Sequence, residues 1–348
     1  MSQAKIISTI GPASAGRVIL EEMALAGMAV ARLNFSHGAL AGHRLRINAI
    51  RGLNKKYGHN IKILQDLEGY RIRVGRLKGS RPVLLKKGEG VFLTNARTMG
   101  SKDMVPFDYC GPLKDIKRGS SVYIDDGNIM LLVKKSTREY LQTEVVMPGL
   151  LKENKGVNIP GAVLSFQGLT DKDKTDLDFG MAGGVDFIAQ SFVRGKNDIL
   201  ELKDYIKASA FRHKIIAKIE NRQGLDNIDE IIEVADGIIV ARGDLGVSVP
   251  IYEIPVLQKI IINKCNRRGK FVVTATQMLE SMTEHPRPTR AEASDVANAV
   301  LDGSDYLMLS AETAVGKYPV ESVRMMRDII RFTGGFLKKG KRDFTGYH

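Results

Sequence analysis

The feature that most constrains the fold is a set of short apolar runs, each followed at once by a small polar or charged residue. Val- and Ile-rich runs of this length are typical of strands that are buried on both faces. Seven such runs end at Thr9, Asn34, Asp66, Lys218, Asp244, Thr276 and Ser310. Because a (β/α)₈ barrel builds its active site from the ends of its strands, these scattered residues are predicted to form one cluster.

The spacing of the runs supports this fold class. Most strand ends lie roughly 25 to 35 residues apart, which leaves room for one helix between strands. Helix-like segments in the intervals include 18–26, 43–54, 198–209, 251–268 and 290–301. A further apolar run over 187–189 supplies an eighth strand, and 319–333 supplies the last helix. The sequence therefore predicts an α/β protein with a TIM (β/α)₈ barrel.

The interval between Asp66 and Ala189 is far too long for one βα unit. It alternates short β-like pieces with glycine turns, which is typical of a small antiparallel β-barrel domain. We therefore expect a barrel over 1–69 and 159–335, an inserted β-domain over 70–158, and a basic tail over 336–348. An insertion after the third strand would lie over the active site and could act as a lid.

Charge alone leaves two classes of partner open. The chain of 348 residues carries 52 basic and 39 acidic side chains, a net charge of +13. A basic surface can bind nucleic acid, or a basic cleft can collect small anions. Dense basic runs occur only at 134–135 and 338–342, and there is no zinc finger or aromatic RNA-stacking signature. We therefore expect a solvated basic surface and no nucleic-acid partner.

The two cysteines, Cys110 and Cys265, are far apart and predict neither a disulfide framework nor a metal site. The N-terminus runs into a strand without the charged and apolar regions of a signal peptide. No apolar stretch reaches the roughly 18 residues that a membrane helix needs. We expect a cytoplasmic protein with no membrane partner.

Two carboxylates follow neighbouring strands of the predicted barrel. Glu220 and Asp244 offer oxygen ligands, which suit Mg²⁺ or Mn²⁺, although a salt bridge at the barrel mouth is the alternative. Lys218 precedes Glu220 by one alternation, so both side chains point the same way. Such a lysine can neutralise a transferring phosphoryl group. A Schiff-base lysine and a solvent-exposed lysine are the alternatives.

Gly243 allows the backbone to approach a ligand, and its N–H can bind a carboxylate or phosphate, although a Gly-Asp pair is often only a turn. The hydroxyls of Thr276 and Ser310 can position water or relay a proton. Capping of the following helices is their alternative role.

Four residues near the second and third strands suggest a phosphate and a second cation. Arg32 suits phosphate. Asn34, Ser36 and Asp66 offer oxygen ligands for a monovalent ion, with a hydrogen-bonded loop network as the alternative. We interpret His37 as a loop residue near a nucleotide.

Seven segments of the chain resemble pyruvate kinase, in family order from Lys5 to about Glu321. They cover 5–14, 32–38, 155–161, 218–221, 241–246, 275–282 and 286–299. The resemblance implies a barrel with an inserted lid domain. It also implies a glycolytic phosphotransferase that moves the phosphoryl group of phosphoenolpyruvate to ADP, giving pyruvate and ATP.

The resemblance also implies a role for each matching residue. Glu220 and Asp244 would hold Mg²⁺ or Mn²⁺, and Lys218 would stabilise the phosphoryl group. Thr276 would assist protonation, with Ser310 and Glu312 in support. Arg32, Arg73 and Lys155 would contact phosphates, and Asn34, His37, Arg73 and Lys155 would bind the nucleotide. The backbone of Gly243 and Asp244 would bind the substrate carboxylate. Asn34, Ser36, Asp66 and the Leu67 carbonyl would form a potassium cage.

The sequence departs from the family after the third strand. The family usually shows Asp-Thr-Lys-Gly-Pro-Glu-Ile-Arg, whereas 66–73 reads Asp-Leu-Glu-Gly-Tyr-Arg-Ile-Arg. Arg71 stands in the place of the Glu. Because members with Lys there resemble potassium-independent enzymes, we predict weak potassium activation or none. Tyr70 replaces the hinge proline, and we expect a looser hinge.

We find no counterpart of the family's C-terminal domain and therefore expect non-allosteric, hyperbolic kinetics. A homodimer through barrel faces is compatible with the sequence. The alternative function, motivated by the altered 67–71 segment, is a catalytically weakened pyruvate-kinase-like binding protein.

Overall fold

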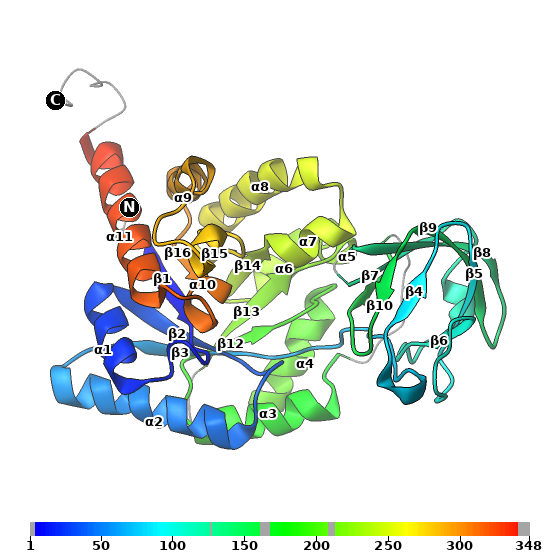
Figure 1. Ribbon diagram of the computed structural model, residues 1–348. Coiled ribbons are helices and arrows are strands. Elements are labelled where there is room, and N and C mark those ends of the chain that lie inside the picture. Colours follow the sequence, from blue (N-terminus) through cyan, green and yellow to red (C-terminus); the bar gives the residue numbers. More distant parts are fainter. Residues whose placement is uncertain (1–3, 126, 161–167, 208–212, 340–348) are drawn as a thin grey trace.

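The computed structural model describes residues 4–125, 127–160, 168–207 and 213–339. Eight parallel strands close into a barrel, in the order β1, β2, β3, β12, β13, β14, β15, β16 and back to β1 (Figure 1). The strands are β1 (Lys5–Thr9), β2 (Met28–Asn34), β3 (Lys62–Asp66), β12 (Phe187–Gln190), β13 (Lys214–Ile219), β14 (Gly237–Ala241), β15 (Phe271–Ala275) and β16 (Tyr306–Leu309). The predicted TIM barrel is confirmed.

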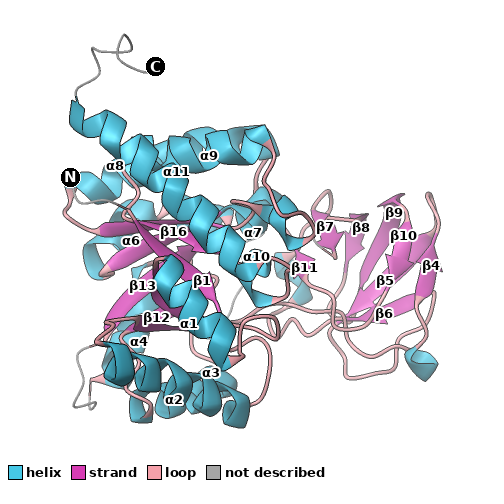
Figure 2. Cartoon of the chain, turned by 60° about the vertical axis from the view of Figure 1, so that its left-hand side comes forward, coloured by secondary structure: helices cyan, strands magenta, loops and turns pink. Residues whose placement is uncertain are grey.

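Helices surround the barrel as an outer layer (Figure 2). The longer ones are α1 (Arg17–Ala26), α2 (Leu40–Tyr57), α3 (Asp171–Ala182), α4 (Lys196–Ile206), α8 (Ile254–Arg267), α9 (Arg290–Asp302) and α11 (Pro319–Lys339). Four shorter helices, α5 (Arg222–Asp226), α6 (Ile228–Val234), α7 (Arg242–Ser248) and α10 (Ala311–Ala314), follow strands β13, β14 and β16. Capping boxes begin α3 at Thr170 and α9 at Thr289, which satisfies their first backbone N–H groups.

Several predicted helix ends differ from the structure. Helix α2 extends three residues beyond the predicted 43–54 at each end, and α8 begins at Ile254, after a short 3-10 turn that starts at Ile251. Helix α11 continues to Lys339 and does not end at 333, because Ile330, Thr333 and Leu337 keep packing on the core at helical spacing. Helix α4 ends at Ile206, and Ser209 lies outside the described residues. The predicted basic tail is therefore helical up to Lys339, and its remainder, 340–348, also lies outside them.

The segment between β3 and β12 forms a separate β-lobe, as predicted, but its strands make two sheets and not the single closed barrel that was expected. Its strands are β4 (Val83–Leu85), β5 (Gly90–Thr94), β6 (Met104–Pro106), β7 (Ser121–Ile124), β8 (Ile129–Ser136), β9 (Leu141–Met147), β10 (Gly149–Leu151) and β11 (Val157–Asn158). Six of them form a sheet in the order β11-β7-β8-β9-β5-β6, and β10 pairs with β4. All these pairs are antiparallel except β5 with β6.

Each part has its own hydrophobic core. The β-lobe buries apolar side chains from Ile72 to Ile159, in a cluster distinct from those of the barrel. The barrel interior is filled by residues such as Ile7, Ile216 and Val273, and a larger cluster lies between the strands and the helices. Within the described ranges, no helix combines the length and the apolar character that crossing a membrane requires.

Candidate active site

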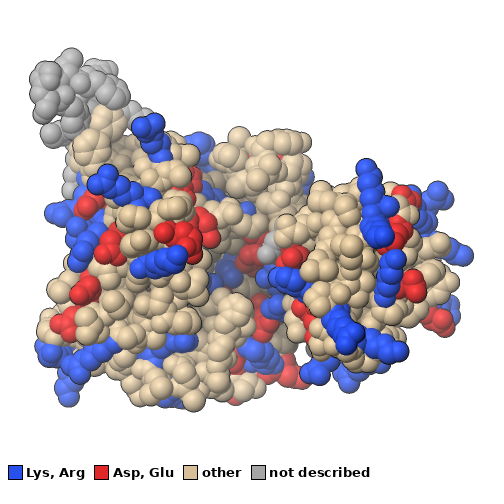
Figure 3. All heavy atoms as spheres, in the orientation of Figure 1, with Lys and Arg blue, Asp and Glu red and all other residues tan. Residues whose placement is uncertain are grey.

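The carboxyl ends of the barrel strands bring the predicted polar residues to one face, beside the β-lobe. In Figure 3 the surface is hollowed between the barrel and the β-lobe, and acidic and basic side chains gather there. Parallel pairing explains the convergence, since strands that run the same way end at the same rim. The register aligns Thr9 with Arg32 and Asn34 with Asp66 on neighbouring strands.

The centre of the site is the Lys218 ammonium group. Its Nζ lies 3.1 Å from Asp66 Oδ1 and 3.0 Å from Glu220 Oε1. It also donates a hydrogen bond to Ser191 Oγ at 2.7 Å. Lys218 is only 8% exposed, so the solvent-exposed alternative is wrong. A buried ammonium between carboxylates keeps its charge.

The pKa shifts follow from this arrangement. Burial alone would lower the pKa of Lys218, but Asp66 and Glu220 outweigh it and raise that pKa. Burial would raise the pKa of Asp66, but Lys218 and Arg32 hold it below its usual value. The pKa of Glu220 is raised, because burial and the nearby Asp244 carboxylate outweigh the attraction of Lys218.

Glu220 and Asp244 fit a divalent cation. Glu220 is held in place because its Oε1 faces Lys218 and its Oε2 accepts the backbone N–H of Phe192 at 2.6 Å. The Glu220 and Asp244 carboxylates repel each other, and a cation bound between them would relieve this repulsion. Among the described residues no group of three or more acidic, His or Cys side chains could hold a metal. Mg²⁺ commonly keeps several water or substrate oxygens, so two carboxylates would suffice as protein ligands.

Arg32 completes the charge balance at Asp66. Its Nε donates to Asp66 Oδ2 at 2.7 Å, and its Nη1 donates to Thr9 Oγ1 at 2.9 Å. Both oxygens of Asp66 therefore face a fixed cation. Of the other residues predicted to hold a monovalent ion, Asn34 Oδ1 accepts the Ser36 N–H, and the Leu67 carbonyl accepts a hydrogen bond from Ser191 Oγ. These contacts correspond to the predicted alternative, a hydrogen-bonded loop network.

Thr276 lies in a strained turn at the end of β15. Both Thr276 and Gln277 have positive φ, 68° and 53°. This conformation is costly for a side chain other than glycine, and most of all for the β-branched Thr276. Arg242 stabilises the turn by donating to the Thr276 carbonyl at 2.6 Å while it pairs with Asp295. The Gly243 N–H, expected to bind a ligand, donates to Thr276 Oγ1 at 2.8 Å.

Ser310 lies at the start of α10 without a side-chain capping bond, so the capping alternative is not observed there. Its backbone N–H donates to Glu312 Oε2 at 2.7 Å, and Glu312 Oε1 accepts the Leu279 N–H at 3.0 Å. Glu312 is fully buried and joins the ends of β15 and β16.

A loop that follows β2 carries His37, which is exposed. The loop is fixed by His43 on α2, whose Nε2 lies 3.0 Å from the His37 carbonyl oxygen. The His43 ring stacks on Phe35 with centroids 4.1 Å apart. Burial lowers the pKa of His43, so the ring stays neutral and can donate to this carbonyl.

Comparison with known proteins agrees with this geometry. The family model for the barrel domain of pyruvate kinase matches residues 1–323. The chain belongs to the pyruvate kinase family. It is 48% identical over 333 residues to a pyruvate kinase of Staphylococcus saprophyticus, and 47% identical over 328 residues to one of Geobacillus stearothermophilus. These alignments cover 94% and 93% of the chain but 56% of each relative, so the chain spans about half the length of the relatives it matches.

In this member of the pyruvate kinase family, two basic residues of the β-lobe pair with acidic neighbours. Arg73 Nη2 lies 2.7 Å from Glu68 Oε1, and Lys155 Nζ lies 2.7 Å from Asp125 Oδ1. Both were predicted to contact phosphates. They lie near the two crossings between barrel and lobe, where they pair with these acidic side chains.

The hinge differs from the expectation of a looser connection. The Tyr70 hydroxyl donates to the Asp108 carbonyl at 2.5 Å and accepts the Cys110 N–H at 2.9 Å. Tyr70 therefore ties the hinge to a loop of the β-lobe, because its phenol supplies a donor and an acceptor that proline lacks.

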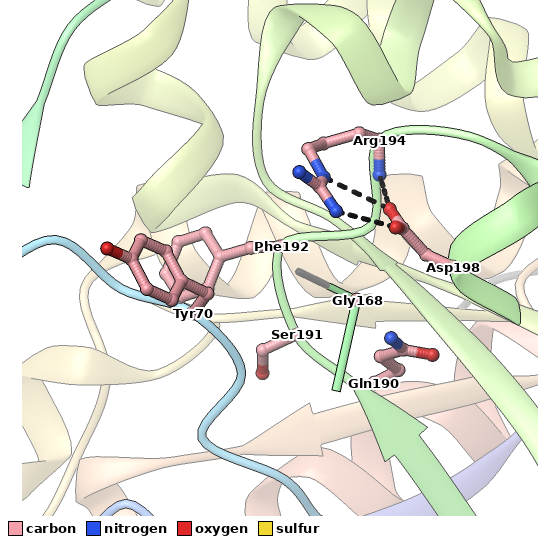
Figure 4. Close-up of a pocket in the computed structure, with 7 residues that line it drawn as sticks. All are labelled: Tyr70, Gly168, Gln190, Ser191, Phe192, Arg194 and Asp198. Atoms are coloured by element: carbon pink, nitrogen blue, oxygen red, sulfur yellow. Dashed lines mark hydrogen bonds and ion pairs between the residues drawn. The ribbon is translucent and has the colours of Figure 1, made fainter. Parts of the chain in front are cut away.

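Three contributors were missed by the sequence predictions: Ser191, Phe192 and Arg242. Ser191 and Phe192 follow β12, the one strand for which no terminal residue was singled out. They line a small pocket with Tyr70, Gly168, Gln190, Arg194 and Asp198. Figure 4 shows Tyr70 and Phe192 on one side of this pocket and the Arg194–Asp198 pair on the other. A search of every strand end, including that of β12, would have found Ser191.

Proposed function

We propose that the chain transfers the phosphoryl group of phosphoenolpyruvate to ADP, with pyruvate and ATP as products. The observation that carries this proposal is the buried Lys218 ammonium beside Glu220, with Asp244 close enough to perturb both groups. Phosphoryl transfer depends mainly on positioning and on charge stabilisation, and this cluster is built for both.

Glu220 and Asp244 would hold Mg²⁺ or Mn²⁺, which when bound would neutralise negative charge on the phosphoryl oxygens. Lys218 would face the phosphoryl group in transit, since its charge is secured by Asp66. Arg32 would contact a phosphate. The backbone of Gly243 and Asp244 would receive the substrate carboxylate once the Gly243 N–H turns from Thr276 Oγ1.

The Thr276 hydroxyl would assist delivery of a proton to the enolate. It donates to the Ala275 carbonyl at 2.6 Å, and its strained backbone directs it away from regular strand geometry. Ser310 would support this step together with Glu312, whose carboxylate accepts the Ser310 backbone N–H and so fixes the start of α10.

The nucleotide would lie beside the loop after β2, where Asn34 and His37 are available. Arg73 and Lys155 would reach its phosphates by exchanging Glu68 and Asp125 for the more highly charged ligand. This exchange would couple nucleotide binding to movement of the β-lobe, which we propose spans 70–158 between barrel segments 1–69 and 159–335.

We propose that potassium activates weakly or not at all. Asp66 already faces Arg32 and Lys218, and Arg71 adds a third fixed positive charge nearby. A monovalent cation in the cage of Asn34, Ser36, Asp66 and Leu67 would therefore meet repulsion.

We also propose a cytoplasmic location, supported by the two free thiols, Cys110 and Cys265. The homodimer expected from the sequence stays a prediction, which the mass of the chain in solution would test.

The test is pyruvate release from phosphoenolpyruvate and ADP with Mg²⁺, with and without potassium. We expect turnover that depends on Mg²⁺ and changes little with potassium. Binding of nucleotide without pyruvate release would favour the alternative, a pyruvate-kinase-like binding protein. Strong activation by potassium would contradict the role given to the fixed cations.

A further inference from the structure

We propose that the Arg71 guanidinium competes with the divalent cation for Asp244, and so sets how tightly the chain binds that ion when no substrate is present. The inference rests on the proposed function, in which Asp244 is one of two ligands of the ion. Arg71 belongs to the segment that leads from β3 into the β-lobe.

Arg71 and Asp244 form an ion pair between the β-lobe and the barrel rim. Arg71 Nη2 lies 3.6 Å from Asp244 Oδ1, and the side chains are 25% and 31% exposed. At this distance and burial, the attraction is only partly screened by water. A divalent cation at Asp244 would meet the same guanidinium as a repelling neighbour.

The protein makes room for the guanidinium at this position. A Cβ on Gly156 would come within 2.7 Å of Arg71 Nε and 2.8 Å of its Nη2. Gly156 has no left-handed backbone that would require glycine, so a side chain at this position would be opposed mainly by the guanidinium. The Phe192 ring lies on another side, with its centroid 6.0 Å from Arg71 Cζ.

Each of the three carboxylates at the site faces a positively charged side chain. Asp66 faces Arg32 and Lys218, and Glu220 faces Lys218. Asp244 faces Arg71, which belongs to the segment that leads into the β-lobe. Since Glu220 and Asp244 repel each other, the guanidinium stabilises the pair before a metal arrives. The same contact must weaken metal binding, because both cations act on one carboxylate.

The experiment measures Mn²⁺ binding by electron paramagnetic resonance of the free ion, on the full chain without substrate or nucleotide. Arg71→Gln removes the charge, and Arg71→Lys keeps it. Gly156→Ala keeps the arginine but displaces its guanidinium. Lys134→Gln is the matched control: Lys134 pairs with Glu144 at 2.8 Å in the β-lobe, and its loss changes the net charge equally.

We expect the Kd for Mn²⁺ to fall roughly threefold to tenfold in Arg71→Gln, as removal of one partly screened unit charge implies. Gly156→Ala should shift the Kd in the same direction, Arg71→Lys should shift it less than Arg71→Gln, and Lys134→Gln should leave it unchanged. A Kd in Arg71→Gln equal to or above that of the wild type would overturn the proposal. An equal fall in Lys134→Gln would also overturn it, since the effect would then be one of net charge.

Two further variants separate this inference from the proposed function. If Glu220→Gln and Asp244→Asn leave Mn²⁺ binding intact, the proposed metal site itself is wrong, and the role of Arg71 falls with it. If they weaken binding at least tenfold while Arg71→Gln and Gly156→Ala have no effect, only the role of Arg71 is wrong. Thermal unfolding of each variant verifies the fold.

Discussion

Replacing Lys218 with methionine removes the charge at the centre of the site and keeps a side chain of similar length. The ammonium group lies 3.1 Å from Asp66 and 3.0 Å from Glu220, and Lys218 is 8% exposed. Methionine fills an irregular space well, so the variant isolates the loss of charge from the loss of packing.

The magnitude follows from the contacts that remain. Removing one partner of a buried ion pair costs about 3–5 kcal/mol of stability. We expect the lower end, because Asp66 keeps Arg32 at 2.7 Å and Glu220 keeps the Phe192 N–H at 2.6 Å. Turnover should fall by about 10³ or more, since a fixed charge aimed at the transferring group is lost.

The assay combines urea unfolding, followed by circular dichroism, with pyruvate release. Lys264→Met is the control: Lys264 pairs with Asp229 between outer helices, at 2.5 Å and with both side chains more exposed. It should lose less than about 1 kcal/mol and keep full turnover. Near-normal turnover in Lys218→Met, or a stability loss no larger than the control's, would refute the reasoning.

Three further predictions concern the loop, the hinge and the strained turn. Burial lowers the pKa of His43, so below pH ~6.5 the unfolded chain binds more protons than the native state, and the native state loses stability. In His43→Gln, the slope of the unfolding free energy against pH between about 5 and 6.5 should therefore be smaller. An unchanged slope would exclude His43 as its source. Tyr70→Phe removes two hydrogen bonds and should speed hydrogen exchange at the Cys110 amide, measured by mass spectrometry, whereas equal exchange would mean that the phenol does not tie the hinge. Thr276→Val should lower turnover more than tenfold, as loss of a proton-relaying group implies, while Thr276→Ser should retain most of it; equal rates in both would assign the effect to the backbone.

The barrel and the centre of the site could be predicted because their physics is local. Buried parallel strands give continuous apolar runs, and the first polar residue after each run lies at the common rim. The two-residue alternation of a strand places Lys218 and Glu220 on one side, and they lie 3.0 Å apart.

The supporting residues could not be predicted in the same way. Arg242 acts through Asp295, which is distant in sequence, and through the carbonyls of a turn with positive φ. Phe192 contributes its backbone N–H, which any residue type could supply. The hinge contacts of Tyr70 depend on where the β-lobe folds back against it, and no local pattern encodes that position.

The most direct test of the central claim follows phosphorus itself. Phosphorus magnetic resonance of the wild-type chain with phosphoenolpyruvate, ADP and Mg²⁺ should show the substrate signal decrease as the γ-phosphate of ATP grows, and Glu220→Gln should abolish this transfer. If nucleotide binds while no ATP signal appears, or if the phosphorus emerges only as inorganic phosphate, the cluster around Lys218 does not perform phosphoryl transfer to ADP.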